Sequence, residues 1–107
     1  MKIKNLLQKS IDTIKNRINT YKSNPTRLLK KMYFVDKGEK FGSFLIFLNY
    51  NEKDHNYSVL MLPDNYPDYI TEVDVKAALD NKYIRFVKCL PDYVYKTCLK
   101  EFNHKKN

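Results

Sequence analysis

Two short apolar runs, separated by a polar segment, occupy the middle of the chain. Residues 43–50 and 57–62 are rich in aromatic and aliphatic side chains, whereas residues 51–56 are all polar. Two strand-like runs around a turn-forming segment predict a β-hairpin. Successive residues of a strand point to opposite faces, and both faces of the first run are apolar, so we expect the sheet to be covered on both sides. One face holds Phe44, Ile46 and Leu48, and the other holds Leu45 and Phe47.

The N-terminal residues have the clearest helical periodicity. Apolar side chains recur at steps of three and four through residues 4–22, at Leu7, Ile11, Ile14, Ile18 and Tyr21. This spacing predicts an amphipathic helix. We expect the helix to dock on the sheet, and pairing with a second copy is the alternative. Asn24 and Pro25 then suit the cap and first position of a short helix that runs to residue 31.

The following segments alternate between strand and helix patterns. Residues 32–35 favour a strand, with a longer helix as the alternative, and a turn follows at residues 36–39. Residues 64–69 are rich in turn formers and predict a loop. A helix is expected to begin after Thr71 and to end at Asn81, which tolerates a left-handed conformation.

The last quarter of the chain predicts one strand and one helix. Residues 83–90 suit a strand, and the charges of Arg85 and Lys88 indicate a sheet edge. The final helix ends in a frayed basic tail at residues 104–107, and its expected buried face is Val94, Tyr95, Cys98, Leu99 and Phe102. The sequence thus predicts a single α+β domain over residues 1–107, with a mostly antiparallel sheet of three to four strands packed with an N-terminal and a C-terminal helix.

Positive charge is unevenly distributed along the chain. The formal net charge is +8, with +8 in residues 1–40, −5 in residues 41–80 and +5 in residues 81–107. This asymmetry indicates a polyanionic partner or self-association. The alternative is that lysine only solubilises the surface, because abundant Lys and Asn are typical of an AT-rich genome such as that of a phage or mobile element.

Three groups of basic residues are candidate contacts for a nucleic acid. With only three arginines in the chain, we expect contacts to phosphates, steep salt dependence and weak sequence specificity. Tyr83, Tyr93 and Tyr95 are interleaved with the last group, as base stacking requires, although such tyrosines also suit the rim of a core. The candidate residues are Lys15, Lys22, Arg27, Lys30, Lys31, Arg85, Lys88, Lys96 and Lys100.

The sequence contains no catalytic motif and no metal-ligand pattern. Its two glycines, Gly38 and Gly42, are too few for a P-loop or a dinucleotide-binding turn. Two cysteines and two histidines lack zinc-site spacing, and Cys98 is expected in the core. Acidic residues within 64–74 could bind a hard cation, but helix capping and a solvated loop account for them. We therefore expect no catalytic residue, no metal and no cofactor.

These patterns favour a small, basic, non-catalytic cytoplasmic protein that engages a nucleic acid or a nucleoprotein machine. No apolar run approaches the length of about 18 residues that a membrane helix needs, so no membrane partner is expected. The first alternative is a protein–protein inhibitor, adaptor or homodimer whose apolar or basic surface meets a partner, including an acidic one. The second is a small RNase-like toxin that uses Tyr83, Arg85 and Lys88.

Overall fold

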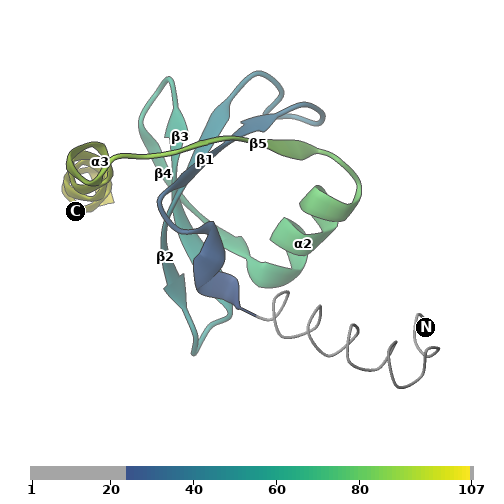
Figure 1. Ribbon diagram of the computed structural model, residues 1–107, viewed down its shortest axis with the longest axis horizontal. Coiled ribbons are helices and arrows are strands. Elements are labelled where there is room, and N and C mark those ends of the chain that lie inside the picture. The colour runs from purple at the N-terminus through teal and green to yellow at the C-terminus, as the bar shows by residue number, and fades with distance from the viewer. Residues whose placement is uncertain (1–23, 107) are drawn as a thin grey trace.

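Five antiparallel strands form one sheet, with helices on both of its faces (Figure 1). The computed structural model describes residues 24–106. The strands are β1 (Lys31–Val35), β2 (Phe44–Asn51), β3 (Asn56–Leu62), β4 (Tyr66–Thr71) and β5 (Ile84–Cys89). Their spatial order is β4-β3-β2-β1-β5, so β1 to β4 form a meander and β5 returns to pair with β1. The α+β class is confirmed.

The prediction of three to four strands was wrong because residues 64–69 are not a loop throughout. Each residue of Tyr66–Thr71 pairs with a residue of β3, and this segment forms the outer strand β4. The turn is confined to the residues between β3 and β4, where Asn65 has a left-handed φ of 54°. Pro67 lacks an N–H group and is tolerated because β4 lies at a sheet edge.

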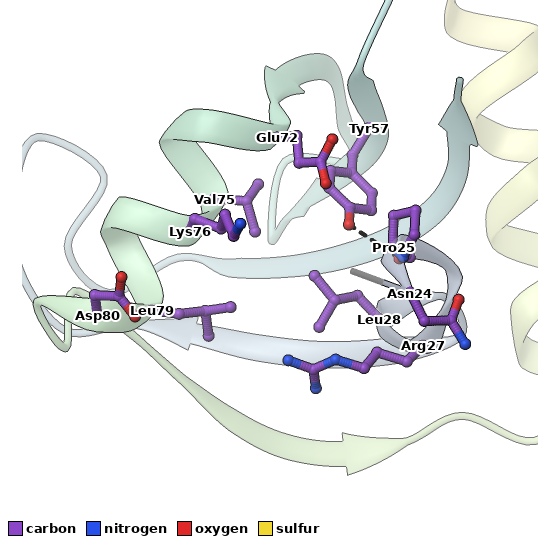
Figure 2. Close-up of a pocket in the computed structure, with 10 residues that line it drawn as sticks. All are labelled: Asn24, Pro25, Arg27, Leu28, Tyr57, Glu72, Val75, Lys76, Leu79 and Asp80. Atoms are coloured by element: carbon purple, nitrogen blue, oxygen red, sulfur yellow. Dashed lines mark hydrogen bonds between the residues drawn. The ribbon is translucent and has the colours of Figure 1, made fainter. Parts of the chain in front are cut away.

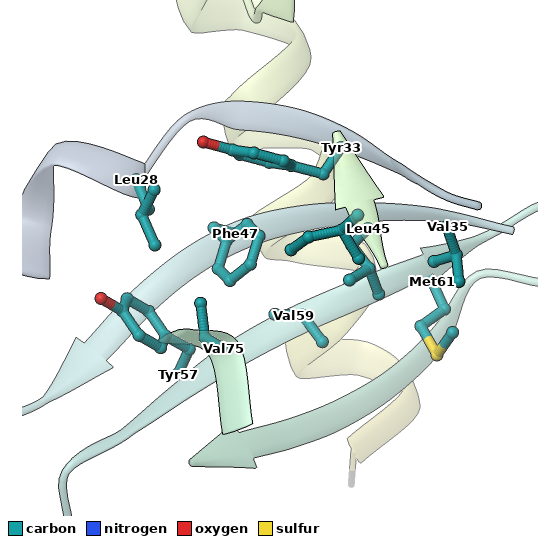
Figure 3. Packing of buried hydrophobic residues seen from close by; sticks show 10 residues of the cluster. Leu28, Tyr33, Val35, Leu45, Phe47, Tyr57, Val59, Met61 and Val75 are labelled. Carbon is teal, nitrogen blue, oxygen red and sulfur yellow. The ribbon is translucent and has the colours of Figure 1, made fainter. Parts of the chain in front are cut away.

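The two faces of the sheet bury separate apolar clusters, which confirms the expectation of cover on both sides. The first cluster lies between the sheet and two elements, the 3-10 helix η2 (Pro25–Leu28) and the helix α2 (Glu72–Asp80), as Figure 3 shows. The second lies under the helix α3 (Asp92–Lys106). Side chains of β2 alternate as predicted, with Leu45 and Phe47 in the first cluster and Ile46 and Leu48 in the second.

Local sequence signals explain where the elements begin. The Asn24 side chain accepts a hydrogen bond from the Thr26 N–H at 3.2 Å, but η2 ends at Leu28 because the chain joins the sheet at Lys31. The strand predicted at residues 32–35 is thus confirmed. Thr71 caps α2 by accepting from the Asp74 N–H at 3.1 Å, as expected.

Two helix ends differ from the prediction. Asn81 has a φ of −96°, and the left-handed residue is its neighbour Lys82, with a φ of 60°. The chain does not fray at residue 104, because α3 continues to Lys106. A salt bridge of 3.7 Å between Lys105 and Glu101, four residues apart, supports this last turn.

The face expected to be buried on the last helix is the one that meets the sheet, because Phe102 is buried in the cluster under α3 and Val94 and Cys98 pack against that cluster. The helix expected over residues 4–22 lies outside the described residues, so its packing on the sheet stays a prediction. Within the part of the chain that the structure describes, none of the helices has the length and apolar character needed to cross a membrane.

Candidate functional site

The pairing of β1 with β5 joins two basic segments that are far apart in the sequence. The Leu90 N–H donates to the Lys30 carbonyl at 2.8 Å, at the point where both strands approach α3. Along the same ladder, Met32 lies opposite Lys88 and Phe34 lies opposite Arg85. The basic residues near positions 30 and 88 therefore form one site in space.

Lys88 and Arg85 point to the side of the sheet that carries α3. Directly opposite residues of an antiparallel ladder share a face. Met32, opposite Lys88, packs against the cluster under α3. The guanidinium of Arg85 lies 4.8 Å from the ring centroid of Phe34, its own opposite residue. Both cations are thus presented on one surface beside the helix.

Arg85 is held in place by Asp36 at the end of β1. The Arg85 Nε lies 3.1 Å from Asp36 Oδ1 and 3.0 Å from Oδ2. A guanidinium has five N–H donors, and these contacts use only the Nε group. No hydrogen bond of the Nη groups is present within residues 24–106, so these donors remain available to an anion.

Lys30 and Lys96 extend the basic surface to the start of α3. Lys30 donates to the Asp92 carboxylate and lies 5.7 Å from the ring centroid of Tyr95. Hydrogen bonding to Asp92 raises the pKa of Lys30, and the same bond lowers the pKa of Asp92, with a smaller contribution from the charge of Lys96. Lys96 forms no salt bridge in the described chain. We call Lys30, Arg85, Lys88 and Lys96 the edge surface.

Other predicted binding residues lie elsewhere. Arg27 and Lys31 are on the α2 side, since Lys31 alternates with Met32 along β1 and its Nζ donates to the Arg27 carbonyl. Lys100 is exposed one turn beyond Lys96 on α3. Lys15 and Lys22 lie outside the described residues. The structure therefore brings together four of the nine predicted side chains, with Lys100 beside them.

Arg27 lines a cavity of about 300 Å³ between η2 and α2 (Figure 2). The cavity is also lined by Lys76 and by two carboxylates, Glu72 and Asp80. Its charges are balanced, so they do not select an anion. The Tyr57 hydroxyl donates to the Pro25 carbonyl at 2.9 Å and ties η2 to the sheet. This cavity is best explained as the junction of η2 with α2.

Of the three tyrosines proposed for stacking, Tyr83 and Tyr93 are exposed and Tyr95 is half-buried. The Tyr95 hydroxyl donates to the Leu48 carbonyl, and burial raises the pKa of Tyr95. Tyr83 lies on the α2 side, under Lys37 at 5.7 Å from its ring centroid. Tyr93 is 74% exposed. Because Tyr83 lies away from Arg85 and Lys88, the three side chains of the RNase-like alternative do not converge.

Three phenylalanines at the site were missed in the sequence. Phe34 has its ring centroid 5.1 Å from that of Phe44 and 6.4 Å from that of Phe41. Phe34 and Phe44 flank the turn between β1 and β2 and are opposite each other in the ladder. Their positions on either side of the predicted turn were the signal in the sequence that could have indicated this contact, because residues at facing strand ends lie on one face of the sheet.

A hydrogen-bonded group at the hairpin turn has a structural explanation. The Tyr50 hydroxyl donates to Glu72 Oε1 at 2.6 Å and lies 3.2 Å from His55 Nδ1. The hydrogen bond to Glu72 raises the pKa of Tyr50 to about 12. The Glu72 N–H also donates to the His55 carbonyl at 2.8 Å. These contacts fasten the β2–β3 turn to the start of α2.

Cysteine and acidic side chains do not assemble a metal centre among residues 24–106. Cys98 is half-buried in the cluster under α3, where burial raises the pKa of its thiol, and Cys89 is exposed. Glu72 and Asp74 lie in the first turn of α2, where the helix dipole favours carboxylates. That position accounts for both of them.

Comparison with known proteins adds no functional information. No protein-family model, curated protein or solved structure matches this chain. The edge surface and the three phenylalanines beside it are therefore the basis on which a function can be argued.

Proposed function

We propose that this chain is a small non-catalytic protein that binds the phosphate backbone of a nucleic acid through its edge surface. The observation that supports this most directly is the β1–β5 pairing, which sets Arg85 and Lys88 on one face, with Lys30 and Lys96 at the end of that face. The net charge of +8 supplies long-range attraction for any polyanion.

The types of cation suggest contacts to phosphate rather than base readout in a duplex groove. The edge surface has a single arginine, whose Nε is already bonded to Asp36. The lysines are point charges without the planar geometry that reads a base edge. Binding that depends on phosphates releases counterions and weakens as salt is added. We therefore expect low sequence specificity.

Fluorescence anisotropy with a labelled 16-nucleotide oligomer tests the proposal. The double variant Lys88→Ala/Lys96→Ala removes two cations of the edge surface. We expect weaker binding and a plot of log affinity against log salt that is shallower by about 1.4 for two lost single-strand phosphate contacts. The matched control Lys53→Ala/Lys76→Ala removes two exposed lysines from the hairpin turn and α2. Equal losses in the two double variants, or no complex with the wild-type protein at low salt, would contradict the proposal.

A second candidate function is a protein–protein module, and the edge strand β5 favours it. Phe86 is 51% exposed and Val87 is 37% exposed on a strand that, among the strands of residues 24–106, pairs only with β1. An open strand edge with apolar side chains can accept a strand of a partner or of a second copy. Sedimentation velocity of the wild-type chain and of Phe86→Ser would test this. A concentration-dependent dimer that the variant loses would support it, and a monomer at all concentrations would count against the homodimer.

A further inference from the structure

Three phenylalanine rings lie together on a part of the sheet that neither η2, α2 nor α3 buries. The ring of Phe34 contacts the rings of Phe41 and Phe44 edge to face. Phe41 is 66% exposed, and the other two rings are half-buried. α3 packs on the same face, against β2, β3 and β4. None of the three rings belongs to either buried cluster of the described domain.

The rings are continuous with the cations of the edge surface. One cross-strand row runs through Leu62, Phe44, Phe34 and Arg85, and the next runs through Leu60, Ile46, Met32 and Lys88. The Arg85 guanidinium already lies over the Phe34 ring at 4.8 Å from its centroid. An occupant of this face would therefore meet aromatic surface and positive charge within a single row.

This combination fits unpaired nucleotides better than the other classes of ligand. Exposed aromatic rings give a stacking surface that every base can use, and neighbouring cations hold the backbone. In a duplex the base faces are stacked inside the helix and cannot reach the rings. An apolar protein surface would cover the rings but would also desolvate Arg85 and Lys88, which is costly unless each charge gains a partner.

We infer that this face binds single-stranded nucleic acid, with bases stacked on Phe34, Phe41 and Phe44 and phosphates against Arg85 and Lys88. The inference rests on the proposed function, because it names the substrate class of the same site. Three adjacent rings provide for a short contact of a few nucleotides. Every base has a stacking face, so the contact discriminates strandedness rather than sequence.

Anisotropy titrations with three fluorescein-labelled probes of equal length separate stacking from charge. The probes are a 12-nucleotide thymidine strand, a 12-unit abasic strand and a 12-base-pair duplex. We expect the full-length protein to bind the thymidine strand at least about five-fold more tightly than the abasic strand, since each stacked base contributes that much or more. Equal affinity for the thymidine and abasic strands, or tighter binding of the duplex, would overturn the inference.

Substitution of a single ring tests whether the bases stack on these phenylalanines. Phe41→Leu alters an exposed ring, so the fold should be retained, which far-ultraviolet circular dichroism checks. We expect this variant to lose affinity for the thymidine strand and to keep its affinity for the abasic strand. The matched control is Tyr66→Leu, which removes a 55% exposed ring from β4. Equal losses in the two variants would overturn the placement of the bases on Phe41.

The outcomes distinguish this inference from the function on which it rests. If all three probes bind equally and Lys88→Ala/Lys96→Ala weakens them all, the backbone-binding function stands and the stacking inference fails. If no probe binds at low salt, both fail. If Phe41→Leu instead abolishes a concentration-dependent dimer seen by sedimentation, the rings form a protein interface and the inference is overturned.

Discussion

Tyrosine hydroxyl groups fix the positions of several elements in this small domain. Tyr50 bonds to Glu72 at the start of α2, Tyr57 to the Pro25 carbonyl at η2, and Tyr95 to the Leu48 carbonyl of β2. Each bond joins residues that are distant in the sequence. A protonated hydroxyl is required in each case, because each hydroxyl donates to an acceptor oxygen. The stability of the domain should therefore depend on the ionisation of tyrosine.

High pH should destabilise the fold through Tyr50 and Tyr57. The hydrogen bond to Glu72 raises the pKa of Tyr50 to about 12, and burial raises the pKa of Tyr57 to about 12. In the unfolded chain tyrosine has a pKa of about 10. Between pH 10 and pH 12 the folded state therefore binds more protons than the unfolded state. The stabilisation that the two protonated hydroxyls provide is complete below pH 10 and is lost as pH rises from 10 to 12.

Urea unfolding at pH 9 and pH 11 measures this loss. We expect the wild-type protein to lose more stability between the two pH values than Tyr50→Phe, which retains the ring and cannot ionise. Ultraviolet titration of the folded protein should also show tyrosines that ionise above pH 11. Identical pH dependence of the two proteins would contradict the role given to the Tyr50 hydroxyl.

The helix α3 is held to the sheet by a narrow set of apolar contacts. Phe102 is 3% exposed, and its ring centroid lies 5.8 Å from that of Tyr69 on β4. Near the other end of α3, Lys30 and Asp92 form the ion pair of the edge surface. The side chain of Lys30 is 43% exposed and that of Asp92 is 74% exposed, and ion pairs open to solvent contribute little to stability. Burial of Phe102 should therefore dominate the attachment of α3.

Removal of the Phe102 ring should cost about 3–5 kcal/mol of unfolding free energy, the usual range for a buried phenylalanine replaced by alanine. The neighbouring substitution Asn103→Ala is the control, because Asn103 is exposed on the same helix, and we expect a change within about 0.5 kcal/mol. Urea unfolding followed by circular dichroism measures both. Similar stabilities for the two variants would show that α3 is not fastened through Phe102.

Most of these elements could be predicted from the sequence, and the exceptions have physical causes. The β2–β3 hairpin was predictable because both its runs are apolar and its turn is wholly polar. β4 was not, because Tyr66–Thr71 gain order from pairing with β3 rather than from their own strand propensity. Local propensity likewise predicted a helix to residue 31, whereas pairing with β5 draws Lys31 into β1.

The site was predictable in its charges but not in its arrangement. The sequence identified Lys30, Arg85, Lys88 and Lys96 as candidates. However, side chains alternate between the two faces along β1, so Lys31 lies on the opposite face, where its Nζ contacts the carbonyl of Arg27. A shift of register between Met32 and Tyr33 changes which β5 residues face α3, and nothing local indicates it. The aromatic part was assigned to tyrosines, whereas the rings beside Arg85 are phenylalanines.

Charge is distributed between the described domain and the residues that precede it. Residues 24–106 contain 14 basic and 11 acidic residues, whereas residues 1–23 contain 6 basic residues and 1 acidic residue. Residues 24–106 thus have a modest net charge of +3, so local clustering must add to the long-range attraction that the +8 of the whole chain supplies. Binding should therefore be sensitive to ionic strength.

Affinity for a single strand should fall as salt increases. If Arg85, Lys88 and Lys96 each contact one phosphate, log affinity should fall with log salt at a slope of about −2, and affinity should drop about 20-fold between 50 and 200 mM salt. Anisotropy titrations at four salt concentrations measure the slope. A slope near zero would mean that phosphates are not the contacts.

The location of the contact is the most direct test of the central claim. Amide chemical shifts of the ¹⁵N-labelled full chain would be recorded while a 12-nucleotide thymidine strand is added. Binding at the edge surface and the rings beside it predicts shifts in β1, β5 and the first turns of α3, and also at Phe41 and Phe44. Shifts confined to α2 and the β2–β3 turn, or none at millimolar oligomer, would contradict the account.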